Sequence, residues 1–161
     1  MQGSNKNFTW PDDGEIDIME HVGFDQVKIH ASIHCKKYYH STGTQMTAIT
    51  TVRDCSQNFP VYSVTWNAEI VQIAVDGKMY FNFANEHSGC DAWPFVNKMH
   101  LLLNIAVGGG WGVQKGIDDT IFPIRIEVDY VWMYQEKLQG IELQQRNIRS
   151  PIVNYSLKLV A

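Results

Sequence analysis

Short stretches rich in valine, isoleucine, tyrosine, tryptophan and phenylalanine recur along this sequence, and turn-forming residues separate them. No window of about eleven residues or more has the 3.6-residue apolar period of an amphipathic helix. β-Branched and aromatic side chains pack well on a pleated sheet, whereas Gly, Pro, Asn and Asp favour turns. The pattern therefore predicts an all-β chain, folded as a sandwich or jelly roll.

One hairpin is marked most clearly, because Asp76-Gly77 can supply the positive φ angles of a type I′ turn between strands at 69–75 and 78–83. Further strands are expected at 14–21, 27–34, 45–52, 61–67, 100–107 and 124–134. The last stretch, 154–160, could add an edge strand or pack on the outer sheet.

Length and composition limit the remaining choices. The 161 residues are 45% hydrophobic and 19% charged, which suits one folded domain with a real core. The formal net charge is −4 and Lys and Arg do not cluster, so nucleic acid is not an expected partner. No apolar run is long enough to span a membrane, so no membrane partner is expected either. Residues 1–7 lack an apolar signal-peptide core.

Cysteine spacing argues against a zinc site. The three cysteines, Cys35, Cys55 and Cys90, have no C-x-x-C pair. One disulfide and one free thiol remain an alternative.

Three acidic residues, Glu15, Asp17 and Glu20, alternate with apolar residues in one predicted strand. On a pleated strand Glu15 and Asp17 share one face, and Ile16 and Ile18 face the core. Strict alternation would place Glu20 on the core face, so we predict a bulge between Asp17 and Glu20. Long side chains that lean together could then bring the two glutamates towards the roughly 5.5 Å separation of a retaining glycosidase.

Such a pair needs one ionised and one protonated carboxyl group, and the charge of Asp17 between them could supply that difference. Two other interpretations suit the spacing equally well. The acids could solvate the outer face of an edge strand, or they could bind calcium. The 12% aromatic share favours the sugar-binding interpretation, because aromatic rings stack on sugar rings.

The acidic segment, Gly14-Glu-Ile-Asp-Ile-Met-Glu-His21, resembles the E-x-D-x-x-E signature of glycoside hydrolase family 16, in its laminarinase-type β-1,3-glucanases. The resemblance continues in order to about Gln135, through segments at 28–34, 61–66, 75–80, 93–95, 103–112, 116–123 and 127–131. It implies a β jelly-roll sandwich of two curved antiparallel sheets, with the acids on the concave face.

The resemblance also implies roles for single residues. Glu15 would be the nucleophile, Asp17 its helper and Glu20 the acid/base. Trp10 and Trp111 match aromatic positions that line the cleft, whereas His34 and Asn104 match polar positions that contact sugar hydroxyls.

Three further positions are expected to have structural roles. Trp66 and Trp93 are assigned to the core. Asp129 matches a carboxylate that in many relatives helps to hold a structural calcium ion, which oxygen ligands suit.

Relatives usually have a longer segment before the acidic strand. We therefore expect residues 1–135 to form a catalytic domain that lacks N-terminal strands, with 136–161 as an unassigned tail. Uncovered apolar faces and strand edges would favour association with another chain.

The resemblance implies an endo-acting, retaining hydrolase of β-1,3-glucan or mixed-linkage β-glucan, with a polysaccharide as its partner. No cofactor is required, because two carboxylates and water suffice. The alternatives are a non-catalytic β-glucan-binding module and an inactive fragment. Relatives are mostly secreted, so an extracellular or periplasmic location is expected.

Overall fold

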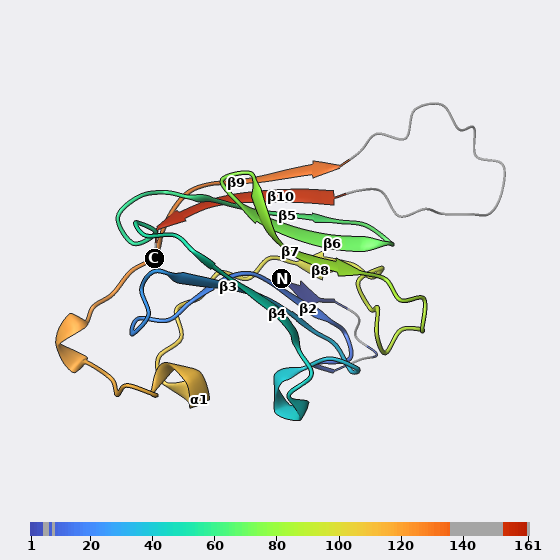
Figure 1. Ribbon diagram of the computed structural model, residues 1–161, viewed down its shortest axis with the longest axis horizontal. Coiled ribbons are helices and arrows are strands. Elements are labelled where there is room, and N and C mark those ends of the chain that lie inside the picture. The colour runs from blue at the N-terminus through green and yellow to red at the C-terminus, as the bar shows by residue number, and fades with distance from the viewer. Residues whose placement is uncertain (5–6, 8, 136–152, 161) are drawn as a thin grey trace.

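Two antiparallel β-sheets lie face to face in the computed structural model, which describes residues 1–4, 7, 9–135 and 153–160 (Figure 1). The first sheet has the strand order β4-β3-β2-β1-β8, and the second has the order β7-β6-β5-β10-β9. The predicted all-β sandwich of antiparallel sheets is confirmed.

The first sheet contains β1 (Gln2–Gly3), β2 (Glu15–His21), β3 (Lys28–His34), β4 (Met46–Thr51) and β8 (Met99–His100). The second contains β5 (Val61–Trp66), β6 (Ile70–Val75), β7 (Lys78–Ala84), β9 (Glu127–Gln135) and β10 (Val153–Val160). Three short helical turns are η1 (His40–Thr42), α1 (Gly109–Gly112) and η2 (Asp119–Ile121). Within the described residues no helix is long and apolar enough to cross a membrane.

The hairpin between β6 and β7 forms as predicted. Val75 pairs with Lys78, and the two residues between them have positive φ, 49° at Asp76 and 76° at Gly77. These are the backbone angles that a type I′ turn requires.

The core lies where β2 and β3 face β5, β6 and β7. Alternate residues of each strand are buried, as the period of two demands. They include Ile16, Ile18, Ile29, Ile33, Tyr62, Val64, Val71, Ile73, Phe81 and Phe83. Trp66 and Trp93 belong to this cluster, as expected, and the Trp93 ring stacks on Phe83 with centroids 5.3 Å apart. Cys35 and Cys55 are buried and Cys90 is exposed, all as free thiols.

The prediction of a strand at 100–107 is wrong for most of that segment. Only Met99 and His100 pair, as β8, and they pair with the two residues of β1. Residues 101–107 have no strand structure. A strand needs a hydrogen-bonded neighbour, and β1 ends after two residues, so apolar sequence alone does not create one here.

The expectation of an edge strand at 154–160 is also wrong. β10 lies between β5 and β9 and pairs with both along its length, so it is an interior strand of the second sheet. The remainder of the predicted tail, 136–152, lies outside the described residues.

Candidate active site

The three acids of β2 lie on one face of the first sheet because of a bulge. Glu15 pairs with His34 and Asp17 pairs with Ser32, but Glu20 pairs with His30, so Ile18 and Met19 together oppose Ala31. Paired residues share a face, and alternate residues of β3 lie on the same side of it. The predicted bulge between Asp17 and Glu20 is therefore confirmed, and it returns Glu20 to the acidic face.

A second bulge, in the opposite sheet, supports the first. Ile73 pairs with Phe81 but Ala74 pairs with Met79, which leaves Tyr80 as the extra residue of β7. The half-buried Tyr80 hydroxyl donates a hydrogen bond of 3.3 Å to the carbonyl oxygen of Ile18. A bulge disrupts the regular ladder, and here a side chain from the facing sheet binds a carbonyl within it.

Trp10 contacts the first acid directly. Its indole Nε1 donates a hydrogen bond of 2.6 Å to Oε2 of Glu15. The ring also lies against His40 and Tyr39, with centroids 5.3 and 6.0 Å away. These contacts hold the indole beside the carboxylate that it binds.

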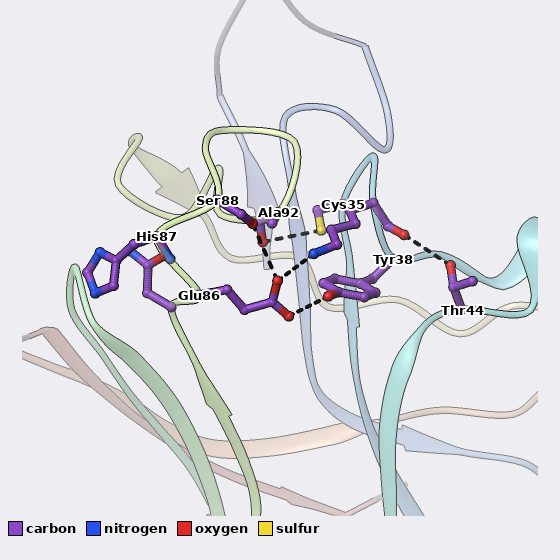
Figure 2. Close-up of polar contacts among 9 residues, drawn as sticks. Cys35, Tyr38, Thr44, Glu86, His87, Ser88 and Ala92 are labelled. Carbon is purple, nitrogen blue, oxygen red and sulfur yellow. Dashed lines mark hydrogen bonds and ion pairs between the residues drawn. The ribbon is translucent and has the colours of Figure 1, made fainter.

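The segment that carries Tyr39 and His40 is tied to the loop after β7 (Figure 2). Glu86 accepts hydrogen bonds from the Tyr38 hydroxyl and the Lys37 ammonium group. At the base of the segment the Cys35 thiol donates to the Ala92 carbonyl over 3.5 Å. Hydrogen bonds between segments far apart in the sequence thus hold the segment that packs against Trp10 in place.

Asp17 connects the first acid to a histidine. Its Oδ2 lies 3.3 Å from Nε2 of His34, and its side chain also acts on Glu15, where both its charge and a hydrogen bond between the two carboxyl groups favour the protonated form of Glu15. Burial works to lower the pKa of His34, but the hydrogen bond to Asp17 and the three carboxylates outweigh it, so the pKa is raised. Protonation of His34 would offset part of the negative charge of the neighbouring acids.

The two glutamates differ in their surroundings. Burial, followed by the charge of Asp17, raises the pKa of Glu20 to about 7. The same two causes raise the pKa of Glu15, but there the Trp10 hydrogen bond opposes the shift by favouring the ionised form. The Ser32 hydroxyl lies 3.1 Å from Oε2 of Glu20, placed to donate to it, and this hydrogen bond opposes the rise in the pKa of Glu20.

Aromatic side chains also lie near Glu20. His30, the pairing partner of Glu20, meets the ring of Trp111 edge to face with centroids 4.8 Å apart. Trp111 lies in α1, inside the glycine-rich segment. Burial lowers the pKa of His30, which favours its neutral form.

The structure thus places Trp10 and His34 beside Glu15 and Asp17, and Trp111 near Glu20. It does not bring Asn104 into this group. Asn104 is exposed in the unpaired segment 101–107, where it makes no hydrogen bond to the acids in the described part of the chain.

Asp129 is exposed on β9. Among the described residues no group of three or more His, Cys, Asp or Glu side chains could hold a metal ion. The calcium site expected at Asp129 stays a prediction, since carbonyl and amide oxygens can also bind this ion.

Sequence reasoning missed several neighbours of the acids. Ser32 and His30 could have been found, because polar residues at 30, 32 and 34 alternate with apolar residues at 29, 31 and 33. Tyr39 and His40 carry no such signal, since they follow the strand in an irregular segment.

Chemically, the arrangement holds two half-buried carboxyl groups in different surroundings on one face of the first sheet. The pKa of both is raised, but at Glu15 an indole N–H opposes the shift, whereas the pKa of Glu20 reaches about 7. An anionic nucleophile and a protonated acid are the pair that glycoside hydrolysis with retention requires.

Known proteins with related sequences share this framework. A β-glucanase of Rhodothermus marinus is 44% identical over 131 residues, which cover 78% of this chain and 46% of that protein. A clotting factor G α subunit of Tachypleus tridentatus is 33% identical over 144 residues, 84% of this chain and 20% of that protein. The chain therefore spans less than half the length of either relative.

Solved structures give the same result. A non-specific endo-β-1,3(4)-glucanase superposes with a TM-score of 0.70 at 34% identity, covering 98% of this chain and 49% of that one. The laminarinase of Rhodothermus marinus superposes with a TM-score of 0.71 at 31% identity, covering 96% and 55%. The sequence pattern of glycosyl hydrolases family 16 matches residues 1–132. With the E-x-D-x-x-E strand and its bulge in place, the chain belongs to glycosyl hydrolase family 16.

Proposed function

We propose that this chain provides the catalytic face of an endo-acting, retaining glycoside hydrolase of β-1,3-glucan or mixed-linkage β-glucan. The observation that carries the proposal is the pair of glutamates on one face of β2, one bound by an indole N–H and the other with its pKa raised to about 7. Opposite protonation states at neighbouring carboxyl groups are what double displacement needs.

In the first step Glu15 attacks the anomeric carbon while the glycosidic C–O bond breaks. The leaving oxygen takes the proton of Glu20, and a covalent glycosyl-enzyme forms. In the second step water attacks the same carbon, Glu20 accepts a proton from that water, and the bond to Glu15 breaks. Asp17, which is paired with His34, lies beside Glu15 and helps to position it.

The substrate class follows from the relatives and from the flanking rings. Variants of the solved endo-β-1,3(4)-glucanase carry 1,3-β-D-cellobiosyl-glucose at the active site. In this chain Trp10 and Trp111 provide rings for stacking on glucose units, and His34 provides a polar contact. A polymeric substrate also suits an extracellular or periplasmic location.

The test measures reducing-sugar release from laminarin by the purified chain and by Glu15→Gln and Glu20→Gln. Mixed-linkage glucan and agarose serve as comparison polymers. Each variant is expected to lose activity by more than a hundredfold, since general acid catalysis alone contributes roughly 10²–10⁴. The matched control is Glu69→Gln, an exposed acid that pairs with His87 and should retain full activity.

Stereochemistry provides a separate check on the mechanism. Proton NMR of the first product should show the β-anomer. Glu15→Gln with full activity, or an α-anomer released first, would refute the proposed chemistry. Binding of laminarin without cleavage would support the glucan-binding alternative instead.

A further inference from the structure

Three oxygen atoms form a line that begins at the acid/base candidate. Oε2 of Glu20 lies 3.1 Å from Oγ of Ser32, and that Oγ lies 3.2 Å from Oγ1 of Thr47 in β4. Thr47 Oγ1 in turn donates to the carbonyl oxygen of Ala31 over 3.0 Å. Ser32 is 5% exposed, so water has little access to it.

Counting hydrogens shows that the contacts compete. Each hydroxyl group carries one hydrogen, and a backbone carbonyl can only accept. Thr47 donates to the Ala31 carbonyl, so in its contact with Ser32 it accepts. The Ser32 hydroxyl is placed to donate to Oε2 of Glu20 and to Oγ1 of Thr47, but it has one hydrogen for both. Thr47 therefore competes with the Glu20 carboxylate for this hydrogen, whereas a protonated Glu20 can itself donate to Ser32 and leave that hydrogen to Thr47.

We propose that Thr47 acts through Ser32 to hold Glu20 in its protonated, proton-donating form. Ser32 and Thr47 are then positioning residues for the acid/base, and β4 contributes to the site although it carries none of the acids. The inference rests on the proposed function for its catalytic meaning, but the protonation of Glu20 can be measured without it.

Other charged and titratable groups also act on Glu20 and must stay constant in a test. Asp17 and Glu15 lie on β2, and His30 and His34 lie on β3. Tyr80 interacts with Glu20 from β7, and the amino group of Met1 interacts with it from beside β2. A variant at Thr47 changes none of these groups.

The decisive variant is Thr47→Val, which keeps the shape of the side chain and removes its hydroxyl. Ser32 then has a hydrogen free for the Glu20 carboxylate, and this favours ionisation. The pKa of Glu20 should fall by about one unit, the size of one hydrogen bond to a charged group. The measurement is a ¹³C NMR titration of the Glu20 carboxyl, assigned by its loss in Glu20→Gln.

A double-mutant cycle separates this effect from simple packing. In a Ser32→Ala background Thr47→Val should leave the pKa of Glu20 unchanged, because no hydroxyl remains to be redirected. Thr47→Ser keeps the hydroxyl that accepts from Ser32 and should keep the original pKa. Thr51→Val is the matched control, since Thr51 lies on the same face of β4 but accepts from Lys28.

Two results would overturn the inference. One is an unchanged pKa of Glu20 in Thr47→Val. The other is an equal fall in the Ser32→Ala background, which would mean that Thr47 acts independently of Ser32. If the chain hydrolyses glucan, the basic limb of its pH–rate profile should move down with the NMR value while KM stays unchanged. A chain without activity would contradict the proposed function but still give the NMR answer.

Discussion

At the scale of residues, the site places chemically identical side chains in different surroundings. Glu15 and Glu20 are both glutamates of β2, and both are desolvated near Asp17. Their hydrogen-bond partners differ, because the Trp10 indole N–H donates to Glu15, whereas the one hydrogen of the Ser32 hydroxyl beside Glu20 has a second acceptor in Thr47. In the proposed function this difference suits Glu15 to the role of nucleophile and Glu20 to that of acid.

The raised pKa of Glu20 predicts a pH-dependent stability. An ordinary glutamate loses its proton near 4.5, but Glu20 in the folded chain keeps it to about 7. Between these values the folded state binds more protons, so the free energy of unfolding falls as pH rises, by about 3 kcal/mol in total. Urea unfolding near pH 4.5 and pH 7.5 should show most of this loss disappear in Glu20→Gln. An undiminished loss in that variant, equal to that of Glu69→Gln, would contradict the assignment.

At the scale of elements, the features that could be predicted from the sequence are those that depend on the local alternation of side chains or on turn residues. The acidic strand, its bulge and the Asp76-Gly77 hairpin follow from a period of two and from turn chemistry. The segment 101–107 has equally strong apolar residues but no strand structure, because pairing depends on a neighbour that no local pattern describes. Ser32 could be inferred from alternation, whereas Thr47 and Tyr80 required knowledge of which strands meet.

The link between the two bulges predicts a catalytic effect of a distant tyrosine. Tyr80→Phe removes the hydrogen bond to Ile18 and should lower stability by about 1 kcal/mol. The bulge then holds Glu20 less well, so kcat should fall roughly tenfold with KM little changed. Tyr62→Phe is the comparison, since this buried tyrosine of β5 lies in the same sheet. Equal losses of kcat in both variants would point to a general loss of packing.

At the scale of the whole molecule, the core occupies only part of the sandwich. Register places Val131 and Met133 of β9, through β10, on the same face as Tyr62 and Val64 of β5. Yet Val64 is fully buried whereas Met133 is 64% exposed. The same inner face is thus buried at β5 and exposed at β9, two strands away. Apolar residues of 102–124 are exposed as well. Such surfaces favour association with other chains.

This asymmetry predicts opposite outcomes for the same substitution at two positions of one face. Val64→Lys buries an ammonium group without a partner and should cost several kcal/mol, enough to unfold a domain of ordinary stability. Met133→Lys should change the free energy of unfolding by less than about 0.5 kcal/mol, because its side chain already meets water. The charge should also weaken concentration-dependent association in sedimentation velocity. If Met133→Lys were as destabilising as Val64→Lys, the inner face of β9 would have to be covered, either by this chain or by a second copy, and sedimentation would distinguish the two.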